Sequence, residues 1–339
     1  MTLSRMKRPA VSIVTPSLNQ GQFIEQAILS VCGQDYPDLE HIIVDGGSSD
    51  RTIPILKKYE HAYDMRWTSE PDNSMYEAIN KGMRQARGQI LAYLNADDLY
   101  FPWTVRAVVE AFREQPSADL VYGDMVNMAM DGRYASIIFS PPEEILRTHL
   151  RFFSLAQPSV FWRRRVFESL KGFDESLHIA SDYDFWLKAS RRFRFRRLNE
   201  VLAVFRFHSK SKTLQSLRSS WEETARVKAR YYGPKTLRTT ADRVLYEVLW
   251  GRYHSTRLLT LWARRLSERE QAEEWQHFLG ANVASAIPLR KLWTLSLFFI
   301  PLFTQAIVRR NPKFIEGYLE SKRLLEVIPG LRRALKVSE

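Results

Sequence analysis

I-L-A-Y-L-N-A-D-D-L, residues Ile90 to Leu99, is the stretch of sequence on which the prediction of the fold rests. Its apolar first half, residues 90–94, is typical of a strand buried on both faces. Asn95, Asp97 and Asp98 follow at the carboxyl end of this strand, where open α/β sheets bind their ligands. Adjacent carboxylates on an apolar backing repel each other, and a divalent cation such as Mg²⁺ or Mn²⁺ would relieve the repulsion. The alternative is a strand followed by a solvated acidic turn.

The sequence before this stretch alternates between apolar runs typical of strands and apolar residues at helical spacing. The predicted strands are residues 11–15, 41–44 and 65–69, and the predicted helices are residues 23–31, 52–59 and 75–86. Strands and helices that alternate at this spacing predict a parallel sheet with right-handed crossovers.

Acidic residues follow three successive predicted strands. Asp45 ends the second strand, Glu70 and Asp72 follow the third, and Asp97 and Asp98 follow the central one. Because parallel strands point the same way, these carboxylates are expected to gather at one edge of the sheet. A recurrence at each strand end indicates a site rather than scattered surface acids.

Composition limits the classes of partner. The chain has 339 residues, enough for two domains, and a formal net charge of +12, which favours anionic partners such as nucleotide phosphates or an anionic membrane surface. No motif for nucleic-acid binding accompanies the charge, so nucleic acid is not expected as a partner. The single cysteine excludes an internal disulfide, and residues 1–9 show no secretory signal. We therefore expect a cytoplasmic protein, with peripheral attachment to the inner face of the membrane left open.

Four motifs in order carry a resemblance to a known family. They read V-S-I-V-T-P-S-L-N-Q from Val11, I-I-V-D-G-G-S-S-D-R-T from Ile42, S-E-P-D-N-S-M-Y-E-A-I-N-K-G from Ser69 and L-N-A-D-D from Leu94. Together they resemble the inverting family-2 glycosyltransferases of the GT-A fold, in particular the bacterial branch that builds surface polysaccharides. The resemblance covers about residues 8–208.

The resemblance implies an α/β fold of the GT-A type: a Rossmann-like, mostly parallel central sheet flanked by helices. It also implies a division of labour along the chain. Residues 8–115 would form the half that binds the nucleotide sugar, and residues 116–213 the half that binds the acceptor. Residues 214–339 would be a helical C-terminal extension, with membrane association open.

For the donor, the resemblance implies contacts in two loops and two motifs. Pro16, Ser17 and Asn19 would lie in the first nucleotide-contacting loop. Asp45 matches an acid that bonds the base, Asp72 a second contact to base or ribose, and Lys81 a lysine near the nucleotide, although it also fits a solvated helix lysine. Asn95, Asp97 and Asp98 match the acidic metal motif, in which Asn95 replaces the first acid. Asp97 and Asp98 are the candidate ligands of the divalent cation: one would bind it, and the other would be a second ligand or a contact to ribose. His208 would be a further ligand unless it is an ordinary surface histidine.

For the acceptor, the resemblance points to two segments. Gln157, in Q-P-S-V-F-W, would contact sugar hydroxyls, although the segment also fits a plain buried strand. Asp182, in S-D-Y-D-F-W, matches the general base that removes a proton from the acceptor hydroxyl. Its place at a helix start would favour the ionised form. Without the family, Asp182 reads as an ordinary helix cap.

The region after residue 214 departs from the shared fold. Residues 292–308 carry no charge and have basic flanks. Three readings remain open for them: a buried helical hairpin, a broken helix on an anionic membrane face, and a membrane span. A lipid-linked acceptor would suit the second.

The function predicted from these features is inverting transfer of a sugar from a nucleoside-diphosphate sugar, most simply a UDP-sugar. The acceptor would be a hydroxyl of a saccharide or lipid-linked saccharide in cell-surface polysaccharide biosynthesis. A non-catalytic nucleotide-sugar-binding protein is the first alternative. A sugar-nucleotide nucleotidyltransferase is less favoured, because the loop at residues 16–21 lacks the basic residue that such enzymes carry.

Overall fold

The computed structural model describes residues 11–129, 135–152, 154–207 and 217–233. Contacts group residues 1–130 and 138–236 into one compact unit. The strands of the described residues are β1 (Val11–Ser17), β2 (Leu39–Asp45), β3 (Met65–Ser69), β4 (Ile90–Tyr93), β5 (Leu99–Tyr100), β6 (Leu120–Ala129), β7 (Ala135–Ile138), β8 (Val160–Arg163) and β9 (Phe195–Phe207). The helices of the described residues are α1 (Ile24–Cys32), α2 (Thr52–Tyr59), α3 (Met75–Gln85), α4 (Thr104–Glu114), α5 (Leu146–Phe152), α6 (Arg164–Leu170), α7 (Ser181–Ala189) and α9 (Leu217–Tyr232), with short 3₁₀ turns at Glu143–Ile145 and Gln157–Ser159.

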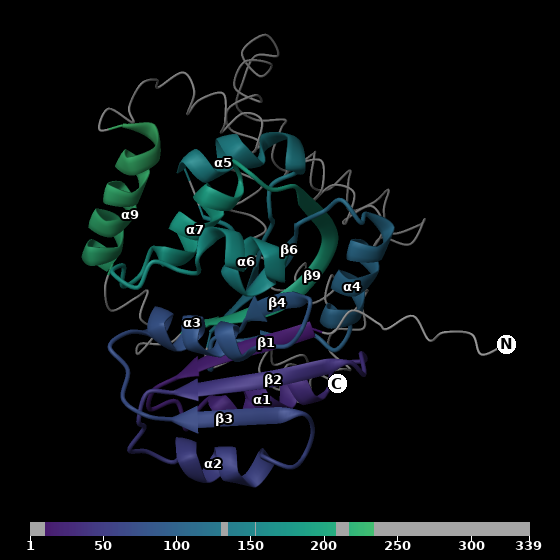
Figure 1. Cartoon of the computed structure of the whole chain (residues 1–339), viewed down its shortest axis with the longest axis vertical. Helices are drawn as coiled ribbons and strands as arrows, with labels where there is room; N and C mark the ends of the chain where they lie inside the picture. The colour runs from purple at the N-terminus through teal and green to yellow at the C-terminus, as the bar shows by residue number, and fades with distance from the viewer. Residues whose placement is uncertain (1–10, 130–134, 153, 208–216, 234–339) are drawn as a thin grey trace, which may run out of the picture. The chain divides into compact units, whose positions relative to one another are not determined.

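The central sheet has the strand order β3–β2–β1–β4–β8–β6–β9–β5. The first four strands are parallel, and β1, β2 and β3 run side by side in Figure 1. Their register pairs Ser17 with Asp45 and Asp45 with Ser69, so three strands end at one edge. This confirms the predicted α/β class and the gathering of strand ends. Strand β8, which follows the 3₁₀ turn at Gln157–Ser159, is antiparallel to both of its neighbours in the sheet, β4 and β6.

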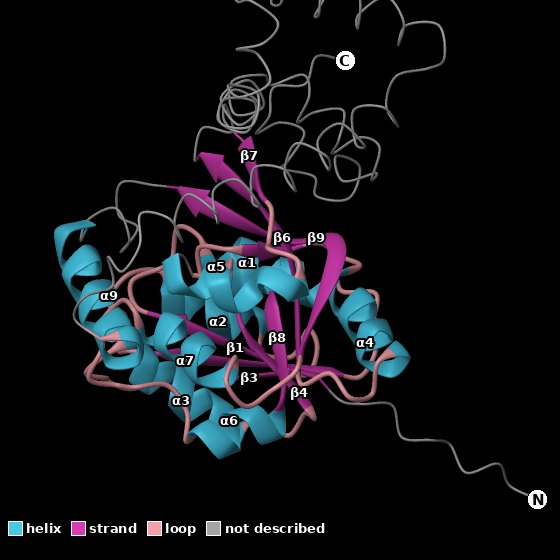
Figure 2. Cartoon of the chain, turned by 90° about the horizontal axis from the view of Figure 1, so that it is seen from above, coloured by secondary structure: helices cyan, strands magenta, loops and turns pink. Residues whose placement is uncertain are grey.

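Helices cover both faces of the sheet. Apolar side chains of α3, α5, α6 and α7 pack with alternate strand residues in one cluster, whereas those of α4 pack in another and those of α1 and α2 in a third. Figure 2 shows α4 on the far side of the strands from α3 and α7. Gly82 allows α3 to lie directly on β1, since a Cβ there would come within 2.5 Å of the Val14 side chain. The core therefore has three layers, with the sheet between helices that pack on its two faces.

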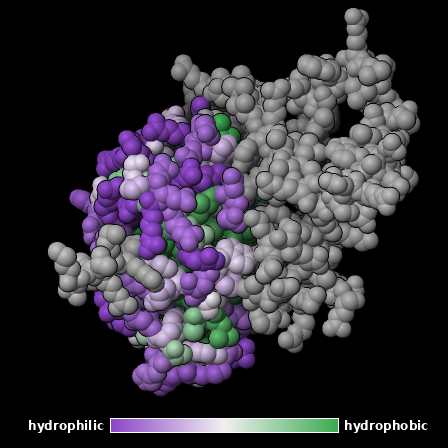
Figure 3. All heavy atoms as spheres, turned by 90° about the vertical axis from the view of Figure 1, so that its right-hand side faces the viewer, coloured by the Kyte–Doolittle hydropathy of each residue, from purple (hydrophilic) through white to green (hydrophobic). Residues whose placement is uncertain are grey.

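The described surface is mainly hydrophilic. Among described residues, Leu18 and Leu29 are the large hydrophobic side chains left about half exposed, and the face in Figure 3 shows only small hydrophobic patches between hydrophilic side chains. None of the helices in the described ranges has the length and apolar character needed to cross a membrane. The predictions for His208 and for residues 292–308 lie outside the described residues.

Candidate active site

A cavity of about 730 Å³ opens at the carboxyl ends of β1 and β4. The cavity therefore occupies the edge at which an open α/β sheet binds ligands. The structure brings seven of the predicted site residues together in its wall: Pro16, Ser17, Asp72, Asn95, Asp97, Gln157 and Asp182. Asn19, Asp45, Lys81 and Asp98 are described but do not line this cavity.

Asp45 organises the loop that follows β2. Its carboxylate is fully buried and accepts hydrogen bonds from the backbone amides of Gly47 (3.1 Å) and Ser48 (2.8 Å) and from the hydroxyls of Ser48 (2.5 Å) and Ser69 (2.7 Å). Gly46 lies against Asp72, because a Cβ at Gly46 would come within 2.7 Å of the Asp72 carboxylate. The buried Asp45 thus fixes the turn at residues 46–48, and this turn contacts Asp72, which lines the cavity. The contact of Asp45 with a base stays a prediction.

Asn19 joins the first loop to the second. It adopts a left-handed backbone conformation (φ 53°), and its side-chain oxygen accepts the amide of Ser49 at 2.9 Å. The amide of Asn19 donates to the hydroxyl of Ser48 at 2.7 Å. Asn19 therefore fixes the loop whose earlier residues, Pro16 and Ser17, line the cavity.

Lys81 is not among the residues that line the cavity. The side chain, one third exposed, forms an ion pair with Glu70 between α3 and the loop after β3. Lys81 therefore has a structural partner of opposite charge. Its contact with a nucleotide stays a prediction.

The two acids of the central motif differ in their surroundings. Asp97 is partly exposed and lines the cavity, whereas Asp98 is fully buried. The Asp98 carboxylate accepts the backbone amide of Arg206 (3.2 Å) and the side-chain amide of Asn95 (3.4 Å). The Arg206 guanidinium donates in turn to the backbone oxygen of Asp97 and to Gln26. Burial, and after it the charge of Asp97, raises the pKa of Asp98 well above its usual range.

The cavity wall offers oxygen ligands for a divalent cation. The described residues hold no group of three or more His, Cys, Asp or Glu side chains that could bind a metal by themselves. The NH₂ group of Asn95 donates to Asp98 and Gln157. Its side-chain oxygen is buried and has no hydrogen-bond partner among the described residues. Asn95 and Asp97 both line the cavity. Such oxygens suit Mg²⁺ or Mn²⁺, which commonly complete their coordination with substrate phosphates and water.

Gln157 is held at the end of the central strand. It is only 8% exposed, donates to the backbone oxygen of Tyr93 at 2.8 Å and accepts from Asn95 at 3.4 Å. The side chain therefore helps to shape the cavity between β4 and the turn before β8.

Asp182 stands in the first turn of α7 and keeps part of its surface open to the cavity. Burial by the surrounding protein raises the pKa of Asp182 to about 7, against hydrogen bonds from the amides of Tyr183 and of Asp182 itself, and the negative charge of Glu223 raises it further. The effect of burial on the pKa of Asp182 is thus larger than that of the helix start, which was expected to favour the charged form. Asp184, the next acid of this motif, is buried and pairs with Lys188 at 2.7 Å.

Two residues near the site were not predicted from the sequence. Arg206 reaches the central motif from β9, and Glu223 reaches the loop before Asp182 from α9. Both lie far along the chain from their partners and in no motif, so no local signal in the sequence marks them.

Comparison with solved structures shows the fold. Staphylococcus aureus TarS 1–349 in complex with UDP matches with a TM-score of 0.53 and 16% identity, over 96% of this chain and 90% of that one. The mannosyltransferase PcManGT from Pyrobaculum calidifontis, in complex with GDP-Man and Mn²⁺, matches with a TM-score of 0.54 and 17% identity, over 94% and 88%. The chain has the GT-A fold of these glycosyltransferases.

Sequence relatives point the same way. A chondroitin synthase of Escherichia coli is 28% identical over 225 residues, which cover 64% of this chain but 31% of that protein. The chain thus spans about a third of the length of this relative. A PGL/p-HBAD biosynthesis glycosyltransferase of Mycobacterium tuberculosis is 28% identical over 183 residues, or 53% of this chain and 69% of that protein. Residues 12–170, just under half of the chain, match the family described as "Glycosyl transferase family 2", so this region is similar to that family.

Proposed function

We propose that this protein is an inverting, cation-dependent glycosyltransferase that moves a sugar from a UDP-sugar to a hydroxyl of a saccharide acceptor. The observation that carries the proposal is one cavity lined by both Asp97 and Asp182, at the carboxyl ends of the parallel strands. The Asp97 carboxylate is suited to bind the donor diphosphate through a cation. The Asp182 carboxylate is suited to accept a proton from the acceptor hydroxyl.

Asp182 is the proposed general base. A base is most effective when its pKa lies near the working pH, and the pKa of Asp182 is raised to about 7. As the acceptor oxygen attacks the anomeric carbon, its proton passes to the Asp182 carboxylate. The bond from that carbon to the diphosphate breaks in the same displacement, so the configuration inverts.

Asn95 and Asp97 are the residues that would hold the divalent cation. A bound Mg²⁺ or Mn²⁺ would offset the charge that develops on the departing diphosphate. Asp98 is fully buried and does not line the cavity, so its predicted role as a further ligand stays a prediction.

The donor and acceptor classes draw support from similar proteins. TarS structures contain UDP and UDP-GlcNAc, and the PcManGT structure contains GDP-Man and Mn²⁺. Relatives named chondroitin and hyaluronan synthases support a saccharide acceptor in polysaccharide biosynthesis. A lipid-linked saccharide falls in the same acceptor class.

The test uses the purified full chain and a panel of UDP-, GDP- and dTDP-sugars with and without Mn²⁺. Binding is followed by calorimetry, and turnover by release of the nucleoside diphosphate. We expect cation-dependent binding of a UDP-sugar, weakened by Asp97→Asn. Asp182→Asn should keep binding and lose at least about a hundredfold in turnover. Asp64→Asn, at an exposed carboxylate, is the matched control.

Each result bears on a different part of the proposal. Absence of binding to every nucleotide sugar would contradict the function itself. Binding without turnover in the wild type would favour a non-catalytic nucleotide-sugar-binding protein. Full turnover in Asp182→Asn would contradict the assignment of Asp182 as the base, but would leave the proposed donor site unaffected.

A further inference from the structure

Three successive backbone amides in the loop before α7 point at one carboxylate. The amides of His178 (2.9 Å), Ile179 (2.6 Å) and Ala180 (2.7 Å) all donate to Glu223 of α9. Glu223 is only 3% exposed. A carboxylate that receives several backbone amides forms strong, charge-assisted hydrogen bonds, so this loop is fixed from the side of α9.

The opposite side of the same loop is held by α3. The hydroxyl of Tyr76 donates to the backbone oxygen of Ile179 at 2.8 Å, and Tyr76 is fully buried. The backbone oxygen of Ala180 accepts the amide of Asp184 and so begins the hydrogen bonding of α7. Ile179 and Asp182 both line the cavity. A shift of this loop would therefore move Asp182 relative to the cavity.

Helix α9 is itself anchored on α7 and its neighbours. Figures 1 and 2 both show α9 beside α7. Val227 is fully buried, the hydroxyl of Tyr231 donates to Asp184 at 2.7 Å, and Arg230 contacts Asp174 at 3.1 Å. Glu223 thus projects from a support that is attached to the helix carrying Asp182.

Charge adds to this geometry. Burial opposes the charge of Glu223, but the three amides outweigh burial and lower the pKa of this carboxyl. The titratable groups that act on Asp182 come from three elements: Tyr76 from α3, Tyr93 from β4 and Glu223 from α9. Burial raises the pKa of both tyrosines well above the usual range, so Glu223 is the charged member of the three.

We propose that Glu223 is the positioning residue for Asp182: by binding three successive amides from α9, it fixes the loop from which the catalytic helix starts. The acceptor side of the site therefore includes a helix beyond residues 12–170, the region that matches the family. This inference rests on the proposed role of Asp182 as the base. The tests below include readouts that do not depend on activity.

The first test is hydrogen exchange of the full chain, with Glu223→Ala, Glu223→Gln and the control Glu222→Gln. Glu222 is an exposed glutamate on the same helix, so its variant removes the same charge at the neighbouring position. We expect the amides of residues 178–180 to exchange about tenfold faster or more in Glu223→Ala, less so in Glu223→Gln, and as in the wild type in Glu222→Gln. Unchanged protection of these amides in both Glu223 variants would overturn the proposal.

The second test is the titration of Asp182, followed by NMR of ¹³C-labelled aspartate carboxyls and assigned with Asp182→Asn. Removal of the Glu223 charge favours ionisation of Asp182, so its titration midpoint should fall in Glu223→Gln and stay in Glu222→Gln. A midpoint unchanged in Glu223→Gln would count against the proposal, whether or not the wild type is active. This variant is close in shape to the wild type and serves if Glu223→Ala does not fold.

The third test separates positioning from donor binding. With the donor selected from the nucleotide-sugar panel, Glu223→Gln should lower kcat by about tenfold to a hundredfold and leave the affinity for UDP with Mn²⁺ unchanged. Loss of UDP affinity in parallel with kcat would contradict a role directed at Asp182. An inactive wild type would contradict the proposed function, while exchange and titration would still decide the role of Glu223.

Discussion

Asp97 and Asp98 are neighbours in sequence, but their side chains lie in different surroundings. Asp98 is fully buried and accepts hydrogen bonds from Arg206 and Asn95, whereas Asp97 is partly exposed at the cavity. We expect Asp98→Ala to lower the free energy of unfolding by about 2–4 kcal/mol, because it leaves buried donors unpaired. Asp97→Ala should change it by less than about 1 kcal/mol and weaken Mn²⁺-dependent nucleotide binding. Urea denaturation and calorimetry measure the two effects, and equal losses of stability would contradict this distinction.

The raised pKa of Asp182 also predicts a pH-dependent stability. The folded protein holds the Asp182 proton up to about pH 7, well above the ordinary pKa of an aspartate, so ionisation of Asp182 disfavours the folded state. Relative to the wild type, Asp182→Asn should be more stable at pH 8.5 by about 2–4 kcal/mol and gain little at pH 4. Denaturation of both proteins across this range measures the effect, with Asp64→Asn as control. A constant difference between the two proteins would rule out the shift.

Turnover should follow the opposite trend with pH. Because the ionised form of Asp182 accepts the proton, the rate of transfer should rise as pH increases through about 7. The pH profile of kcat/KM measures this with the donor from the panel. A profile that is flat between pH 5.5 and 8.5 would argue against Asp182 as the base.

At this scale the sequence predicts the positions of the site better than the direction of each side chain. Strand ends follow from apolar runs, so Asp72, Asp97 and their loops could be placed at one edge in advance. Which of two adjacent acids faces the cavity depends on Arg206, more than a hundred residues away. Such a partner comes from the tertiary fold, and no local pattern contains it.

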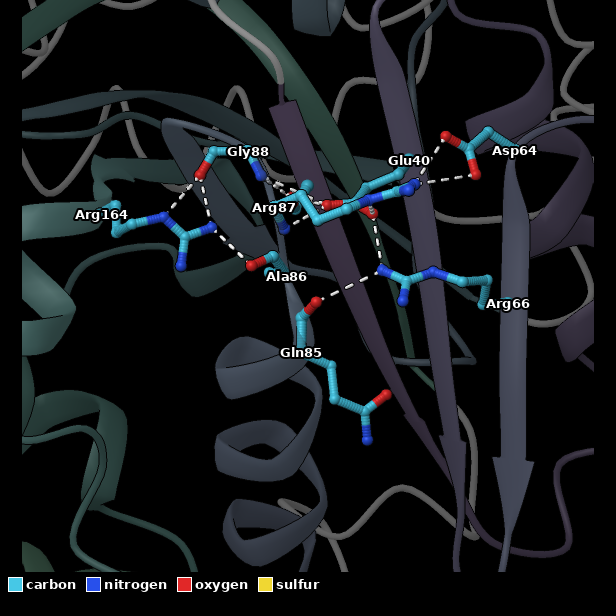
Figure 4. A network of polar contacts seen from close by, with 9 residues as sticks. Glu40, Asp64, Arg66, Gln85, Ala86, Arg87, Gly88 and Arg164 are labelled. Carbon is cyan, nitrogen blue, oxygen red and sulfur yellow. Dashed lines mark hydrogen bonds and ion pairs between the residues drawn. The ribbon is translucent and has the colours of Figure 1, made fainter.

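At the scale of elements, the polar network in Figure 4 joins the amino ends of the parallel strands, opposite the cavity. Glu40 of β2, 5% exposed, accepts hydrogen bonds from Ser12, Arg66, Arg87 and the amide of Gly88. We expect Glu40→Ala to lower the free energy of unfolding by about 2–4 kcal/mol, because it leaves buried donors without their acceptor.

The control for this network is Arg66→Ala, since the Arg66 side chain is 42% exposed. It should cost at most about 1 kcal/mol, because Glu40 keeps its hydrogen bonds from Ser12, Arg87 and Gly88 when Arg66 is removed. Nucleotide affinity should be unchanged in both variants, because the network is at the other edge of the sheet. A loss of affinity without a loss of stability in Glu40→Ala would contradict this assignment.

The order of elements explains where prediction from sequence stops. The segments β3 and α2 match their predicted ranges, because each has a clear period and clear ends. The insertion of β8 between β4 and β6, antiparallel to both, was not predicted. Strand order in this half depends on contacts between segments distant in sequence, and apolar periodicity does not encode their partners.

At the scale of the whole molecule, the compact unit that includes residues 138–236 extends past the matched family region to include α9. We therefore expect a chain that ends at Thr236 to fold and to bind UDP with Mn²⁺ like the full chain. A chain that ends at residue 216 loses Glu223, buried Val227 and Tyr231 together with their contacts to the region around α7. Its free energy of unfolding should fall by at least about 3 kcal/mol.

Denaturation and calorimetry on the two truncated chains separate the contributions of α9 and of the residues beyond it. If the longer chain unfolds as readily as the shorter one, the compact unit needs residues beyond 236, and α9 is not the end of the folded support for Asp182. If the shorter chain remains as stable as the full chain, the contacts from α9 to α7 contribute little. The expected order, with a loss only when α9 is removed, would make this helix an integral part of the glycosyltransferase domain.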